Sequence, residues 1–153
     1  MSQEAVRLLE WMERVYTEME AFLEAESQHL QTADWGALAQ DQPRRDELTG
    51  QLSAVDAERR RLSRAAGLGE EGTLGDLLPG PPREWEERRA ALRERAAEVH
   101  RRNEDNLELI QEALDRSERL LSLLTGDDFD SGYTADGQLA EGSHSSGILS
   151  RRV

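Results

Sequence analysis

The sequence predicts an all-α fold, an elongated antiparallel helical hairpin or bundle of three main helices with a coiled-coil-like seam. Apolar residues recur at alternating spacings of three and four over long stretches, which is the period of one helix face. Charged residues make up 33% of the chain and aromatic residues 5%. Apolar side chains are therefore too scarce for a thick globular core but sufficient for a seam along each helix.

The first helix is predicted over about residues 3 to 31. Its apolar residues form a stripe three positions wide. The stripe comprises Ala5, Leu8, Leu9, Met12, Val15, Tyr16, Met19, Phe22, Leu23 and Leu30. Glutamates outnumber arginines along this helix, and we interpret them as a solvated face.

A second helix is predicted over residues 34 to 66, with Asp34 as its N-cap and Gly67 as its stop. Because proline lacks the backbone N–H, we expect Pro43 to kink this helix or to mark a fresh helix start. The run Arg59 to Arg61 lies among acidic residues, so we interpret it as a charged helix face and not as an anion site.

Residues 67–82 hold five of the 12 glycines and three of the four prolines, and we predict a connector there with one helical turn at residues 74 to 78. The longest helix is predicted over residues 82 to 125, ending at Gly126. Its second half is far more apolar than its first. The domain prediction is therefore a helical domain over residues 1–126 and a disordered tail over residues 127–153, whose few apolar groups cannot offset the entropy of ordering.

Composition excludes several classes of function. All 19 basic residues are arginine, and the chain has no cysteine, so disulfides and thiolate chemistry are absent. The net charge of -13 disfavours nucleic acid and anionic membrane surfaces as partners. Without a spanning apolar stretch, and with a start unlike a signal peptide, the protein is expected to be cytoplasmic.

The sequence offers no catalytic centre, and we expect no enzyme activity, cofactor, metal or small-molecule substrate. Only Glu26 and His29 have the Glu-x-x-His spacing of helical di-iron sites, and the second such motif that these sites need is missing. His144 lies near serines in the predicted tail, where no rigid scaffold holds a base against a nucleophile.

Asn103 and Asn106 fall on the apolar seam of the long helix. Two interpretations stay open: a polar layer that fixes helix register, or a recognition patch.

Farther along the same helix, the apolar residues exceed what a two-helix seam uses, which predicts a groove or face for a client helix. The candidate client-binding residues are Leu107, Ile110, Leu114, Ser117, Leu121 and Leu124. The alternative is that these leucines close the protein's own core.

Two segments resemble the FlgN family of flagellar export chaperones. Residues 100–106, His-Arg-Arg-Asn-Glu-Asp-Asn, are similar to the paired-asparagine segment of that family, and residues 133–138, Tyr-Thr-Ala-Asp-Gly-Gln, resemble its tail motif. The chain departs from the family pattern in having Leu107 after the second asparagine, where glycine is frequent, and in having Pro43 where an unbroken helix is expected.

The resemblance implies a cytoplasmic chaperone of the flagellar type III export system. Such a chaperone binds the terminal helices of the hook-filament junction proteins FlgK and FlgL and brings them to the export gate component FlhA. By the same resemblance, Tyr133, with Asp136 and Gly137, is expected to dock on the cytoplasmic domain of the gate. A linker tyrosine without a partner is the alternative for Tyr133.

Two other functions remain open on sequence alone. One is a helical coiled-coil adaptor or scaffold outside motility, and the other is a secretion chaperone for a different client. A pull-down distinguishes the junction-protein chaperone from the scaffold, because the chaperone retains junction proteins through their terminal helices, whereas a scaffold retains itself or unrelated partners.

Overall fold

The structure is a computed structural model that describes residues 2–80 and 82–126. Its long helices are α1 (Ser2–Gln31), α2 (Trp35–Ala65) and α4 (Glu86–Thr125). A four-residue helix α3 (Leu74–Leu77) and a 3-10 turn η1 (Pro82–Glu84) lie between α2 and α4. This part of the chain contains no strand, so the predicted all-α class is confirmed, and the helix bounds lie close to those expected from the sequence.

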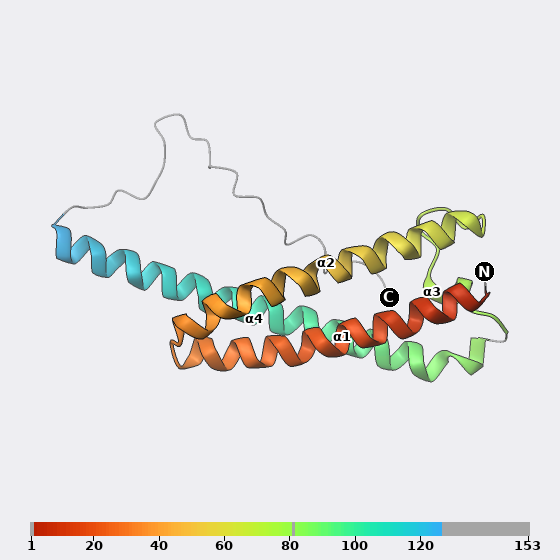
Figure 1. Cartoon of the computed structure of the whole chain (residues 1–153), viewed down its shortest axis with the longest axis horizontal. Coiled ribbons are helices and arrows are strands. Elements are labelled where there is room, and N and C mark those ends of the chain that lie inside the picture. Colours follow the sequence, from red (N-terminus) through yellow and green to blue (C-terminus); the bar gives the residue numbers. More distant parts are fainter. Residues whose placement is uncertain (1, 81, 127–153) are drawn as a thin grey trace, which may run out of the picture.

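The long helices form an elongated bundle in which α2 runs antiparallel to both α1 and α4 (Figure 1). Helix α1 packs against α2 and also against α4, whereas α2 and α4 share few contacts. The central position of α1 agrees with its wide apolar stripe, since a helix with two neighbours has two faces to cover.

The turn between α1 and α2 is built as the sequence predicts. Asp34 is the N-cap of α2 and accepts a hydrogen bond from the backbone N–H of Ala37 at 3.0 Å. Ala33 adopts the left-handed conformation with φ 54°, which reverses the chain within three residues.

Helix α2 continues through Pro43 without a break, so the alternative of a fresh helix start at this residue is wrong. Pro43 is exposed, and its ring therefore faces solvent instead of the seam. The helix tolerates the missing N–H donor because neighbouring turns on both sides are held by packing and ion pairs, including Arg44 with Glu18 of α1 at 2.6 Å.

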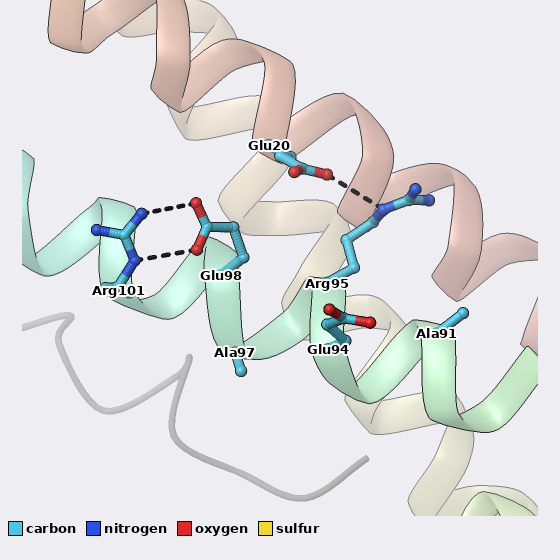
Figure 2. A pocket seen from close by; sticks show the side chains of 7 residues that line it. All are labelled: Glu20, Ala91, Glu94, Arg95, Ala97, Glu98 and Arg101. Atoms are coloured by element: carbon cyan, nitrogen blue, oxygen red, sulfur yellow. Dashed lines mark hydrogen bonds and ion pairs between the residues drawn. The ribbon is translucent and has the colours of Figure 1, made fainter.

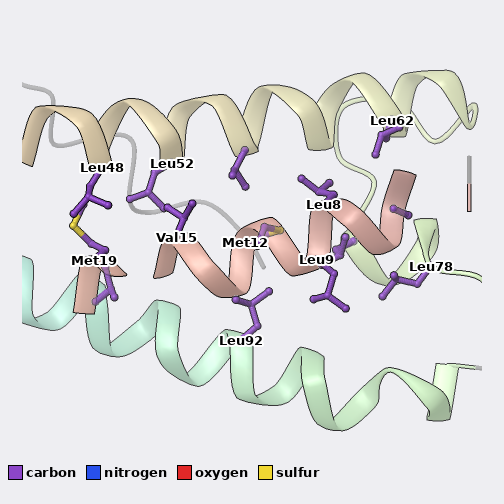
Figure 3. Close-up of a cluster of buried hydrophobic side chains, with 14 of the residues drawn as sticks. Leu8, Leu9, Met12, Val15, Met19, Leu48, Leu52, Leu62, Leu78 and Leu92 are labelled. Carbon is purple, nitrogen blue, oxygen red and sulfur yellow. The ribbon is translucent and has the colours of Figure 1, made fainter. Parts of the chain in front are cut away.

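The core is a continuous strip of apolar side chains between α1 and its two neighbours (Figure 3). The buried members on α1 are Ala5, Leu8, Leu9, Met12, Val15, Met19, Leu23 and Leu30. Those on the other elements are Leu48, Leu52, Val55, Leu62, Leu74, Leu78, Leu92 and Val99. The two lists show that α4 contributes only its first half to the core.

The connector folds back onto α2 and is held there by Arg59. Its guanidinium is buried and donates to the carbonyl oxygens of Gly72 at 2.6 Å and Glu70 at 3.2 Å, while Asp56 accepts from its other nitrogens. The interpretation of Arg59 as part of a charged surface is therefore wrong. The cause is its position on the seam of α2, four residues after Val55 and three before Leu62, where the side chain must point inward.

Helix α4 begins beside the connector and lies parallel to α1. The indole N–H of Trp85 donates to the carbonyl oxygen of Pro79 at 2.6 Å, and Arg88 stacks over the Trp85 ring. Ion pairs then join the two helices in steps of one heptad on α4. They are Arg88 with Glu13, Arg95 with Glu20 and Arg102 with Glu24.

Helix α4 continues past the turn that joins α1 to α2, so its last turns project from the bundle (Figure 1). Asn106 contacts α1 at Leu23 and Glu26, five residues or more before α1 ends at Gln31. Carrying that alignment forward leaves a projection of roughly 20 Å at 1.5 Å per residue. We call residues 107–125 the free half of α4, of which roughly the last 13 residues project beyond α1.

Candidate protein-binding surface

The free half of α4 carries a row of exposed leucines. These are Leu107, Leu114, Leu120, Leu121, Leu123 and Leu124. Leu123 and Leu124, with relative exposures of 81% and 83%, are about as open as a side chain on a helix can be. Scattered surface leucines are ordinary, but a continuous apolar face on one helix marks an interaction surface.

The predicted client-binding residues all lie on this face, with unequal exposure. Leu107, Leu114, Leu121, Leu124 and Ser117 are exposed, and Ile110 is half-buried. The alternative that the leucines close the protein's own core is wrong for the four exposed ones, because their side chains are 42% to 83% exposed.

At the base of the free half, Asn106 is buried in a polar cluster that joins three helices. Its Nδ2 donates to the carbonyl oxygen of Leu23 and to the Glu26 carboxylate, each at 3.0 Å. Arg45 of α2 donates to both oxygens of Glu26, at 2.8 and 2.5 Å, and to Oδ1 of Asn103 at 3.1 Å. We call Glu26, Arg45, Asn103 and Asn106 the polar layer.

The geometry of the polar layer favours the register interpretation of the two asparagines. Asn106 is 1% exposed and Glu26 is 4% exposed, so neither offers polar atoms to a partner in this conformation. Hydrogen bonds in the layer have fixed partners on α1 and α2, and a shift of α4 by one turn would break them.

Sequence reasoning missed Arg45 and Glu26 as partners of the asparagines, although a signal was present. Glu26 follows Leu23 by three residues and precedes Leu30 by four, so it occupies a seam position of α1. Arg45 precedes Leu48 by three residues and likewise falls on the seam of α2. Opposite charges on the seams of neighbouring helices predict a buried pair.

Glu26 and His29, which have the spacing of a di-iron motif, each contact a different partner. Glu26 bonds to Arg45 and Asn106, and His29 Nδ1 lies 2.8 Å from Asp41. Within residues 2–80 and 82–126, no group of three or more His, Cys, Asp or Glu side chains is placed to hold a metal ion.

A surface hollow beside α1 and the middle of α4 is lined mainly by charged side chains that pair with one another (Figure 2). Arg95 Nε lies 3.1 Å from Glu20, and Arg101 donates to Glu98 at 2.7 Å. Hydrogen bonds from Arg101 and then from Arg102 lower the pKa of Glu98 to about 2, so this carboxyl stays ionised at neutral pH and cannot act as an acid.

The predicted gate-docking residues Tyr133, Asp136 and Gly137 lie outside the described residues. Among the helices that the structure does describe, none has the length and hydropathy needed to cross a membrane.

A family model named FlgN, described as FlgN protein, matches residues 1–141. The chain belongs to the FlgN family. The match spans every helix described above and reaches past residues 133–138, so the resemblance read from the asparagine and tyrosine motifs is confirmed. No curated protein and no solved structure matches the chain.

Membership in the FlgN family makes the chain a flagellar export chaperone, a class of protein that binds other proteins and is not a class of enzymes. Six of the eight large apolar side chains that are exposed in the described part of the chain lie on the free half of α4.

Proposed function

We propose that this chain is the cytoplasmic chaperone of the junction proteins FlgK and FlgL, and that it delivers them to the cytoplasmic domain of FlhA. The observation that carries the proposal is the row of exposed leucines on the free half of α4. An amphipathic helix of the client, laid along this face, removes the leucines from water. The family supports the flagellar role, and the projection of α4 supplies room for a client alongside it.

The proposed client site is the set predicted from the sequence. It comprises Leu107, Ile110, Leu114, Ser117, Leu121 and Leu124. Burial of a leucine side chain is worth about 1.5 to 3 kcal/mol, so covering the four leucines of this set contributes roughly 6 to 12 kcal/mol before the cost of association is subtracted.

The experiment is a double substitution, Leu114→Gln with Leu121→Gln, measured by calorimetry against purified FlgK and FlgL. Both leucines are exposed and neither belongs to the buried core, so helicity by circular dichroism should be unchanged. Client affinity should fall by at least tenfold. Glu108→Gln, on the opposite face of the same segment, is the matched control and should bind as the parent does. Equal affinity of the double variant and the parent would remove the client site from this face.

For gate docking we propose Tyr133, flanked by Asp136 and Gly137. A tyrosine combines a large apolar ring with one hydroxyl at low rotamer cost, which suits an anchor residue. Truncation of an anchor costs on the order of 2 kcal/mol, or roughly a thirtyfold loss of affinity.

The test of the docking residue is Tyr133→Ala assayed against two partners separately. Binding to the FlhA cytoplasmic domain should weaken, while binding to FlgK and FlgL should stay intact. A variant that binds the gate domain as tightly as the parent would assign Tyr133 to a plain linker.

A further inference from the structure

The residues on the two edges of the α4 seam change from charged or polar to predominantly leucine where the helix leaves the bundle. One edge repeats every seven residues as Arg88, Arg95, Arg102, Leu109, Arg116 and Leu123, and we call it the first edge. The other repeats as Arg93, His100, Leu107, Leu114 and Leu121, and we call it the second edge. Both edges are charged or polar within the bundle, and both become predominantly leucine in the free half.

Within the bundle, where α4 packs mainly against α1, both edges of its seam carry charged or polar side chains. The first-edge arginines pair across to glutamates of α1. On the second edge, Arg93 pairs with Glu86 and His100 with Glu104, both within α4 itself. A narrow apolar seam with charged edges is thus the pattern of α4 where α1 is its main neighbour.

Helix α1 shows the opposite case within the same molecule. It packs against both α2 and α4, and its apolar stripe is correspondingly wide, with adjacent pairs such as Leu8 and Leu9 both buried. The free half of α4 has the wide pattern. Its apolar face runs from Leu121 on the second edge through Leu124 on the seam to Leu123 on the first edge, and all three are exposed.

From this comparison we infer that the client covers the free half of α4 with two helices, one along each edge, so that client and chaperone form a three-helix bundle continuing the chaperone's own. The inference rests on the proposed function and adds Leu109, Leu120 and Leu123 to the client contacts. A single helix would leave one leucine edge in water.

Charge indicates that the occupant is a different protein and not a second copy of this chain. The free half carries Glu108, Glu112, Asp115 and Glu118 against Arg116 and Arg119, within a chain of net charge -13. Glu104 and Glu118 lie on the outer side of the second edge. The client helix on this edge is therefore expected to present arginine or lysine beside its apolar stripe. A second copy that paired through its own second edge would instead place Glu104 and Glu118 against the same glutamates.

The test compares matched pairs of leucines on the two edges. The first-edge variant is Leu109→Gln with Leu123→Gln, and the second-edge variant is Leu114→Gln with Leu121→Gln. Each is titrated by calorimetry against full-length FlgK or FlgL and against a peptide of one terminal helix from the same protein. Circular dichroism checks the fold, and Glu108→Gln is again the control.

Both variants should lose at least tenfold in affinity for the full-length client, and the single-helix peptide should respond to only one of them. A first-edge variant that binds full-length client within twofold of the parent overturns the inference and leaves the proposed function standing. A single peptide that responds equally to both edges overturns it too, because one helix then spans the face. A free protein whose dimer is lost in either edge variant overturns it in favour of a second copy. Absence of any binding between the parent and either junction protein refutes the proposed function together with the inference.

Discussion

Asn106 lies in the last turn of α4 that belongs to the core, and its side-chain amide links this turn to α1. Its Nδ2 group satisfies the Leu23 carbonyl oxygen of α1, a group near the end of that helix, and one oxygen of the buried Glu26 carboxylate. Leucine at this position would bury more apolar area but leave both acceptors with fewer donors. The buried Glu26 carboxylate in particular gains from a further donor, which is a physical reason for an amide on the seam.

Asn106→Ala should lower the free energy of unfolding by about 1 to 3 kcal/mol, because it removes one buried hydrogen-bond donor from each of two acceptors on α1. Urea denaturation measures this change. In the folded variant, affinity for the junction proteins should stay within twofold of the parent, since the amide is buried and bonded internally. Loss of client binding at unchanged stability would instead make Asn106 a recognition residue.

Arg59 is the corresponding residue at the other end of α2, and its role is to hold the connector. Arg59→Met keeps most of the side-chain volume but removes the guanidinium that donates to the Gly72 and Glu70 carbonyl oxygens and to Asp56, so only Ser63 still donates to Gly72. We expect a loss of about 2 kcal/mol and faster amide hydrogen exchange across residues 67–80.

The control for Arg59 is its neighbour. Arg60→Met removes a half-buried ion pair with Asp56 that lacks the carbonyl contacts of Arg59, and it should change stability by no more than about 1 kcal/mol. If the two variants lose equal stability, the connector is not anchored by Arg59.

At the scale of the element, α2 contains an internal proline whose cost can be measured. Pro43 removes one backbone hydrogen bond to the carbonyl oxygen of Ala39 and is exposed. Pro43→Ala should raise the free energy of unfolding by about 1 to 2 kcal/mol, since the gain in helix propensity exceeds the added entropy of the unfolded chain. A lower urea midpoint for the variant would show that the proline relieves strain in α2.

Element boundaries could be predicted from sequence because each depends on local chemistry. Asp34 caps α2, and Gly126 ends α4 with φ 66°, as the cap and glycine signals indicate. The buried charges could not be assigned in the same way. Whether Arg59 faces solvent or the connector depends on where residues 70–72 return, and a periodic pattern contains no information on that.

At the scale of the whole molecule, the sequence indicated an excess of leucines in α4 but not their exposure. That depends on α1 and α2 ending where the turn reverses the chain, so that nothing in the described part of the structure lies over Leu121 or Leu124. Similarly, the paired asparagines stood out as seam residues, whereas their partners Glu26 and Arg45 required the relative alignment of three helices.

The central position of α1 also sets the order in which the protein is expected to fold. Contacts between α1 and α2 join residues as close as His29 and Asp41, whereas α4 reaches α1 across separations such as 83 residues between Leu23 and Asn106. Short loops close at lower entropic cost, so the hairpin of α1 and α2 should form first and serve as the template on which α4 docks. On the ribosome this order coincides with synthesis, since α4 is the last of the three long helices to emerge.

The folding order can be tested with one core substitution in each part. Leu52→Ala, in the hairpin, should slow refolding, and Leu92→Ala, in the α4 seam, should chiefly speed unfolding, as measured by stopped-flow chevron plots. Nearly equal effects of both substitutions on the refolding rate would mean that all three helices assemble in one step.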